Sequence, residues 1–396
     1  MKKIFKLLLI LLVATVLLMV ALLLLSSKGE NATATSKEQI STTKSAPRIF
    51  SNAEDPLLGA PYRIHSLQNG DFYATLIEYP FGSSPRVDAQ DEFPRGIILY
   101  LHGYNDYFFQ KELAEKADSA GFAFFAIDLH YFGRSYREGD PRADMRSLTE
   151  YFGELDSAIA LSKRIVQQSI DKAAADSASE NSPSAASENA IPVTMPYILI
   201  GHSMGGLNLS LYAAHRPDSH FDAIVLNSPF LEMNFNWAVR NLALPVISGL
   251  GRLFPDVALP GTGDPNYANS LHKSQKGEWD FDTTLKTFAR PKQYLGWVRG
   301  VHLGHNEIKE GLHIKAPILV MHSDCSIDSK EWVEEFTHCD GVLNHEQIAE
   351  QAPNLGENVT TVTIPDGLHD LYLSPKPVRD KAYDETFRFI DKNLRN

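Results

Sequence analysis

A serine lies at the centre of a G-x-S-x-G motif, which spans residues 201–205 with Ser203 in the middle. The motif follows a short apolar run at 197–200 and precedes a helix-like run at 207–214. A strand, a tight turn and a helix in this order expose the serine hydroxyl at the edge of a sheet, and glycine tolerates the backbone angles of such a turn. We therefore predict that Ser203 is a catalytic nucleophile. A glycine-rich turn without chemistry is the alternative.

A serine hydroxyl becomes a good nucleophile only when a base lies next to it. His369 is the candidate base, because it follows the last apolar run, at 359–364, and precedes a helical segment at 378–394. No other histidine of the sequence lies beyond that run. In chains with this strand–turn–helix motif the order is serine, acid, histidine. We expect His369 to accept the proton of Ser203.

Backbone N–H groups near the nucleophile are expected to stabilise a negatively charged oxygen during the reaction. His102 and Gly103 end an apolar run at 97–101, and the loop that begins there is suited to supply one donor. The predicted donors of this oxyanion hole are the N–H groups of Tyr104 and of Met204, the residue after the nucleophile. His102 itself is expected to be structural.

Two histidines three residues apart, His302 and His305, raise the question of a metal site. The surrounding sequence lacks the further carboxylate or cysteine ligands at helical spacing that zinc sites use. We therefore expect no metal in catalysis.

Three stretches carry a family resemblance: LHGYNDY at 101–107, FAFFAIDLHYFGRS at 122–135, and GHSMGG around the candidate nucleophile. Together they resemble the monoglyceride lipase and lysophospholipase branch of the α/β-hydrolases, which overlaps families labelled serine aminopeptidase. The resemblance covers about residues 60–394. It implies hydrolysis of an ester of a lipid-like substrate, such as a monoacylglycerol or a lysophospholipid, without metal or organic cofactor.

The acid of the site departs from this family pattern. Relatives carry an aspartate a few residues after the strand that matches 318–321, and here Ser326 occupies that position. Asp324 and Asp328 flank it, and Asp340 lies farther along the chain. A subset of bacterial relatives has an altered acid loop with an aspartate shortly before a Val-Leu pair, which is similar to Asp340. The resemblance favours Asp340, with Asp324 as the alternative and Asp328 as a third possibility.

The two cysteines of the chain, Cys325 and Cys339, lie next to two of these aspartates. In an exported protein they can form a disulfide, and the alternative is a pair of buried thiols. A disulfide would bring Asp324 and Asp340 close together, so we hypothesise that it fixes the acid loop.

Apolar runs alternate with helical segments, which predicts an α/β fold with a mostly parallel sheet and helices on both faces. The first two strands, 62–67 and 72–79, are expected to form a hairpin with Asn69 and Gly70 in the turn. The other predicted strands are 97–101, 122–129, 197–200, 223–226, 318–321 and 359–364, and the predicted helices are 113–120, 148–168 and 378–394. We expect one hydrolase domain at 57–396.

Two stretches interrupt this alternation. Residues 173–190 are rich in Ala, Ser, Glu and Asn and predict a disordered surface loop. Residues 231–313 are rich in aromatic side chains and show no clear strand, which predicts a helical insertion. Because the insertion follows a strand of the sheet, it projects from the carboxyl ends, where ligands bind. We interpret it as a lid; a packed subdomain apart from the site is the alternative.

The N-terminus predicts attachment to a membrane. Three lysines precede an uncharged apolar run at 7–25, which at about 1.5 Å per residue roughly spans a bilayer core. An uncleaved anchor at 1–25 and a flexible stalk at 26–56 would hold the hydrolase domain on the periplasmic or extracellular face. A cleaved signal peptide, and hence secretion, is the alternative. The net charge of −12 argues against a nucleic-acid partner.

Two other functions stay open. A peptidase acting on short peptides would need carboxylates that hold a free amine, for which Glu278, Asp280 and Asp282 in the insertion are candidates. A membrane-tethered binding protein without activity is the second, although the intact Ser203 and His369 argue against it.

Overall fold

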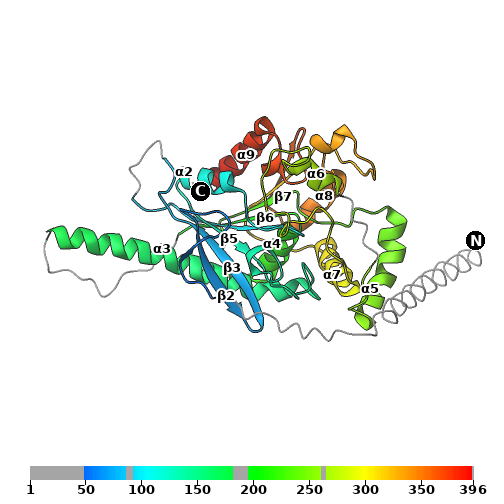
Figure 1. Cartoon of the computed structure of the whole chain (residues 1–396), viewed down its shortest axis with the longest axis horizontal. Helices are drawn as coiled ribbons and strands as arrows, with labels where there is room; N and C mark the ends of the chain where they lie inside the picture. Colours follow the sequence, from blue (N-terminus) through cyan, green and yellow to red (C-terminus); the bar gives the residue numbers. More distant parts are fainter. Residues whose placement is uncertain (1–48, 86–91, 182–194, 260–264, 395–396) are drawn as a thin grey trace, which may run out of the picture.

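The computed structural model describes residues 49–85, 92–181, 195–259 and 265–394. A nine-stranded sheet runs through the molecule in the order β1-β2-β3-β5-β4-β6-β7-β8-β9 (Figure 1). Its strands are β1 (Ala53–Glu54), β2 (Arg63–Asn69), β3 (Phe72–Tyr79), β4 (Ile97–Leu101), β5 (Ala123–Asp128), β6 (Tyr197–His202), β7 (Ala223–Asn227), β8 (Ile318–Ser323) and β9 (Val359–Ile364).

The sheet is mixed, as the apolar runs predict. Strands β1, β2, β3 and β5 pair antiparallel, whereas β5, β4, β6, β7, β8 and β9 pair parallel. Strand β4 is buried along its whole length, which explains its continuous apolar sequence. The hairpin is confirmed, but Asn69 pairs with Phe72, so the turn residues are Gly70 and Asp71. Gly70 has φ +59, a value that favours glycine.

Helices cover both faces of the sheet. Helices α2 (Lys111–Ser119) and α9 (Lys376–Leu394) contribute to one apolar cluster (Figure 1). The opposite cluster contains side chains of α3 (Phe152–Asn181), α4 (Met204–His215), α7 (Leu295–Glu310) and α8 (His345–Gln351). Because the strands carry apolar side chains toward both clusters, the sheet is the buried middle layer of three.

The segment between β7 and β8 contains a π-helical turn η3 (Val239–Ala243) and the helices α5 (Leu244–Leu253), α6 (Asn266–Leu271) and α7. In its described part, 231–259 and 265–313, extended pairing is limited to isolated bridges such as His272 with Trp279. This agrees with a helical insertion that leaves the sheet at the carboxyl end of β7. Its role as a lid stays a prediction.

The prediction of a disordered loop at 173–190 was wrong for residues 173–181, which form the end of α3. Alanine has the highest helix propensity, and an alanine-rich stretch that continues a formed helix extends it without a new nucleation step. Residues 182–194 lie outside the described residues, and so do the predicted anchor at 1–25 and the stretch 26–48 of the predicted stalk. The prediction of a flexible stalk up to residue 56 was wrong at its end, because Ala53–Glu54 form β1 and Asp55 is buried. No helix in the described ranges is long and apolar enough to cross a membrane.

Candidate active site

Ser203 occupies the turn between β6 and α4, with φ 52 and ψ −119. Positive φ is uncommon for a residue other than glycine and here turns the side chain out of the strand direction. The turn leaves no room beside it: a Cβ added to Gly201 would lie 2.9 Å from the carbonyl carbon of Gly205. One added to Gly205 would lie 2.4 Å from the oxygen of Leu101. The two glycines are therefore required by packing.

His369 lies after β9 and faces the serine. Its Nε2 atom is 2.9 Å from the Oγ atom of Ser203. The ring is buried, with the edge-on ring of Tyr267 at 5.5 Å on one side and the ring of His202 at 4.8 Å. These contacts hold the imidazole in the orientation that a general base for Ser203 needs.

Asp340 completes a hydrogen-bonded chain of three side chains. Its Oδ2 atom is 2.8 Å from Nδ1 of His369. Its Oδ1 atom accepts hydrogen bonds from the backbone N–H groups of Val342 and Leu343, each at 2.8 Å. The side chain is completely buried, and these donors stabilise a carboxylate that has no contact with solvent. Hydrogen bonds at Oδ1 thus hold the carboxylate in place while Oδ2 faces the histidine.

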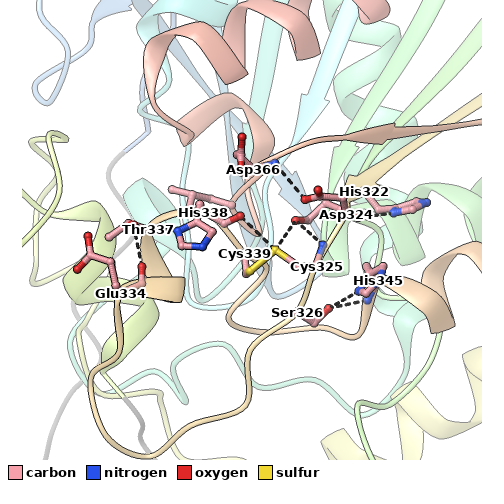
Figure 2. The surroundings of a disulfide bond; sticks show 12 residues. His322, Asp324, Cys325, Ser326, Glu334, Thr337, His338, Cys339, His345 and Asp366 are labelled. Atoms are coloured by element: carbon pink, nitrogen blue, oxygen red, sulfur yellow. Dashed lines mark hydrogen bonds between the residues drawn. A yellow bond between two sulfur atoms is a disulfide. The ribbon is translucent and has the colours of Figure 1, made fainter.

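The two other aspartates are directed elsewhere. Asp324 is exposed and accepts a hydrogen bond from the backbone N–H of Asp366 at 3.0 Å (Figure 2). Asp328 is also exposed. Of the three aspartates weighed from the sequence, Asp340 is the one for which the structure gives a hydrogen bond with His369.

A disulfide joins Cys325 and Cys339 at the base of the loop that carries Asp340 (Figure 2). The alternative of two free thiols was therefore wrong. Next to the disulfide, Ser326 and Asp340 form a parallel β-bridge, in which the Asp340 N–H donates to the Cys325 carbonyl at 3.0 Å. The Ile327 N–H donates to the Asp340 carbonyl at 2.9 Å. The disulfide and the bridge thus both lie directly beside the backbone of Asp340, and the hypothesis that the disulfide fixes this loop stays a prediction.

The two segments that carry the predicted oxyanion donors lie beside the nucleophile. Met204 is buried and begins α4, so its N–H belongs to the first turn, whose N–H groups lack intrahelical acceptors. The loop after β4 approaches from the other side, since a Cβ added to Gly103 would lie 3.1 Å from the Cβ of Ser203. Tyr104 follows directly in this loop.

A buried polar network around Asp370, the residue after His369, was not predicted from the sequence. Asp370 accepts hydrogen bonds from Asn227 Nδ2 at 2.7 Å and from Gln110 Nε2 at 3.1 Å. Its backbone N–H donates to the hydroxyl oxygen of Tyr267 at 3.0 Å. The loop that carries His369 is therefore tied to β7 and to the insertion. Asn227 gave the one usable signal, because it is a polar residue that directly follows the apolar run of β7.

His302 and His305 both lie on α7, and each forms a hydrogen bond with a different partner. Nε2 of His305 is 2.8 Å from the carbonyl oxygen of Phe230, and burial lowers the pKa of His305 to about 4. Nε2 of His302 is 3.3 Å from Asn306 Nδ2. A neutral His305 donates this hydrogen bond to Phe230, which links α7 to the segment that follows β7.

Known structures share this fold. A soluble variant of monoglyceride lipase from Saccharomyces cerevisiae, solved with a substrate analogue, aligns with a TM-score of 0.56 and 13% identity over 88% of this chain and 98% of the other. The monoacylglycerol lipase of Paleococcus ferrophilus aligns with a TM-score of 0.50 and 18% identity over 76% and 96%. At these identities the similarity establishes the α/β-hydrolase fold.

Sequence comparison identifies the family. A monoacylglycerol lipase of Mycolicibacterium smegmatis is 25% identical over 240 residues, which are 60% of this chain and 72% of the relative. The family model of the serine aminopeptidases, S33, matches residues 92–373 and therefore contains Ser203, Asp340 and His369. This match extends over well more than half of the chain, and the chain belongs to the serine aminopeptidase S33 family of α/β-hydrolases.

Proposed function

We propose that the protein is a serine carboxylic-ester hydrolase that acts on lipid-like esters through a covalent acyl-enzyme. The observation that carries the proposal is the hydrogen-bonded chain from Ser203 through His369 to Asp340, with distances of 2.9 and 2.8 Å. A nucleophile, a base within hydrogen-bonding distance and an acid that orients the base are the arrangement that activates a serine hydroxyl.

The reaction proceeds in two halves. His369 Nε2 takes the Ser203 proton as Oγ forms a bond with the ester carbonyl carbon, and the carbonyl oxygen becomes an oxyanion held by the N–H groups of Tyr104 and Met204. The carbon–oxygen bond of the alcohol then breaks, and His369 returns the proton to the leaving oxygen. Water attacks the acyl-enzyme with the same proton transfers, which releases the acid and restores Ser203. Asp340 stabilises the imidazolium form throughout.

A substrate with an acyl chain fits the surroundings of the site. Apolar side chains from the insertion pack in one cluster with Met204 and with the partly buried Tyr104. The ring of Tyr104 lies 5.0 Å from that of Trp297 in α7. Such an environment favours contact with the alkyl chain of an acyl group. A monoacylglycerol or a lysophospholipid has this chemistry, and the relative from Mycolicibacterium smegmatis is named a monoacylglycerol lipase.

The peptidase alternative has less support. The carboxylates proposed to hold a peptide amine have other partners: Glu278 pairs with Arg379, Asp280 with Lys273, and Asp282 accepts from Thr284. Glu278 and Asp280 are also exposed, so water weakens any attraction for a free amine.

We also propose, from the sequence alone, that residues 1–25 anchor the chain in a membrane with the hydrolase domain on the exported side. The apolar run at 7–25 and the lysines before it support this orientation. Protease treatment of intact and permeabilised cells tests it. Degradation of the domain in intact cells or spheroplasts agrees with export, and protection until the membrane is permeabilised contradicts it.

The test of the activity uses the full chain in detergent or lipid nanodiscs. It compares fluorophosphonate labelling and hydrolysis of a chain-length series of acylglycerols for the wild type and Ser203→Ala. We expect labelling and hydrolysis that depend on Ser203, with a preference for esters that carry an alkyl chain. Absence of both reactions in a folded wild type contradicts the proposal. Cleavage of short peptides with a free amino terminus in preference to esters favours the peptidase alternative.

A further inference from the structure

The loop that carries the proposed oxyanion donor is held by one short segment of the insertion. Three successive loop residues, Asn105, Asp106 and Tyr107, form hydrogen bonds with the segment 282–287. We refer to these contacts, from 105–107 to 282–287, as the loop clamp. The two segments lie far apart in the sequence, so the loop conformation depends on how the insertion is seated.

Asn105 forms the first part of the loop clamp. Its backbone has φ 52, which is unfavourable for a residue with a side chain and needs support from its surroundings. Its Nδ2 atom donates to the carbonyl oxygen of Thr287 at 2.8 Å. Its Oδ1 atom accepts from the Thr287 hydroxyl at 3.0 Å and from the Thr287 N–H at 3.3 Å. These hydrogen bonds stabilise the residue that follows Tyr104.

Lys286 forms the central part of the loop clamp, and it is buried. Its Nζ atom lies 2.7 Å from Oδ1 of Asp106, and both side chains are almost completely inaccessible to solvent. The ammonium group also lies over the rings of Phe109 and Phe281, at 5.7 and 5.9 Å. Burial raises the pKa of Asp106, but the charge and hydrogen bond of Lys286, together with smaller effects of His202 and His102, outweigh burial and hold that pKa below its usual value. Asp106 is therefore a buried carboxylate whose counter-ion comes from the insertion.

The position of Asp106 makes this ion pair relevant to the active site. Oxygen and nitrogen atoms of Asp106, His202 and Asp370 lie within 4.8 Å of one another. His202 directly precedes Ser203 in the chain, and Asp370 directly follows His369. Burial lowers the pKa of His202, which favours its neutral form and makes it a weaker counter-charge for Asp106 than Lys286 is. Lys286 is thus the cation that balances Asp106 within this group, and without it a buried carboxylate would be left unpaired.

We propose that Lys286 is a positioning residue for the reaction: its ion pair with Asp106 fixes the loop 103–107 so that the Tyr104 N–H points at the developing oxyanion. Without the ion pair, the Asp106 carboxylate is stable only if water hydrates it, and the loop has to move before the carboxylate can contact water. Since an oxyanion donor acts mainly in the transition state, the loss appears in kcat and leaves substrate binding nearly unchanged. Seating of the insertion thereby assembles the oxyanion hole.

The inference rests on the proposed ester hydrolysis, and its test is done on the full chain in nanodiscs. Lys286→Met removes the charge and keeps most of the apolar stem. We expect kcat to fall roughly 10²-fold, KM to change less than about threefold, and a trifluoromethyl ketone that forms a tetrahedral adduct to lose affinity by about the same factor as kcat. The matched control is Lys273→Met, because Lys273 lies in the same insertion and pairs with the exposed Asp280.

Two further variants separate positioning from folding. Lys286→Arg keeps the charge and is expected to recover at least ~10-fold of the lost kcat. Asp106→Asn combined with Lys286→Met removes both charges and is expected to be more active than Lys286→Met alone, because no unpaired carboxylate remains. If Lys286→Met lowers only the melting temperature while kcat per titrated Ser203 and ketone affinity stay at wild-type values, the inference is wrong. An inactive wild type would instead overturn the proposed function.

Discussion

Ser326 and Asp340 are neighbours in a parallel β-bridge, and the acid that contacts His369 comes from the second of these two positions. The family resemblance places the acid at the first. A loop leaves the end of β8, returns to it, and is closed at its base by the Cys325–Cys339 disulfide. A carboxylate thus reaches the histidine from a later point of the chain than the family pattern has it. This arrangement is compatible with a triad, because a triad is defined by geometry and not by sequence position.

Replacement of the acid is the first prediction. Asp340→Asn is expected to lower kcat by about 10⁴-fold, because an amide stabilises neither the correct histidine tautomer nor the imidazolium. Ester hydrolysis at saturating substrate measures the effect, and circular dichroism checks the fold. Asp324→Asn is the matched control and is expected to change kcat less than twofold, since Asp324 is exposed and contacts the Asp366 N–H. A large loss in the control with little loss in Asp340→Asn would reverse the assignment.

The second prediction concerns the disulfide. Its closed loop is short, and loops of about 15 residues gain roughly 3 kcal/mol from a cross-link in the chain-entropy account. Cys325→Ser with Cys339→Ser is expected to lower the free energy of unfolding by a similar amount and to lower kcat, because Asp340 follows Cys339 directly. Denaturant unfolding and kcat of the oxidised, reduced and double-serine proteins measure both effects. Equal kcat in all three proteins would show that the disulfide is not needed to position Asp340.

The third prediction uses the bridge between Ser326 and Asp340. Paired residues in a ladder carry their side chains on the same side of the sheet. An aspartate at position 326 therefore starts close to the place that Asp340 occupies. Ser326→Asp in the Asp340→Asn background is expected to recover at least ~10-fold of the lost kcat. The comparison protein is Ser326→Asn in the same background, which lacks the charge. Equal activity of the two would contradict a carboxylate at 326 that reaches His369.

The places of Ser203 and His369 in the fold could be predicted from the sequence because each is fixed by a local pattern. Gly201 and Gly205 around Ser203 are required by the close approach of neighbouring backbone, and His369 follows the last strand. The strands were predictable for the same reason, since buried parallel strands are apolar throughout. These signals depend on residues close together in the chain.

Features that depend on distant segments could not be predicted in this way. The local sequence leaves three aspartates as candidates, and Asp340 was favoured only through the family resemblance. In the structure, the returning loop brings the Asp340 carboxylate to His369. Lys286 looks like an ordinary surface lysine in the sequence, and it becomes a buried counter-ion only because Asp106 has to be neutralised where the insertion meets the loop. The helical end of α3, at 173–181, was missed because composition was given more weight than alanine's helix propensity.

The last prediction is a dependence of stability on pH that arises from His305. This side chain is completely buried, and burial lowers its pKa from 6.5 to about 4 in the folded protein. Glu232 Oε1 lies 4.0 Å from its Nδ1 and favours protonation, but that carboxylate is already paired with Lys309 and Arg240. The folded protein therefore holds a neutral His305, which donates from Nε2 to the Phe230 carbonyl.

A histidine whose pKa is lower in the folded than in the unfolded protein stabilises the fold at pH values above its pKa in the unfolded chain. This contribution is lost as the pH falls toward its pKa in the folded protein. Between pH 6.5 and about 4 the unfolded chain binds a proton at His305 that the folded chain does not, so the free energy of unfolding decreases by up to about 3 kcal/mol across this window. His305→Gln keeps a donor for Phe230 and does not titrate. Denaturant unfolding at pH 7.5, 5.5 and 4.5 is expected to show a smaller decrease for this variant than for the wild type. Because both proteins share all other titrating groups, identical decreases would mean that His305 is protonated in the folded state.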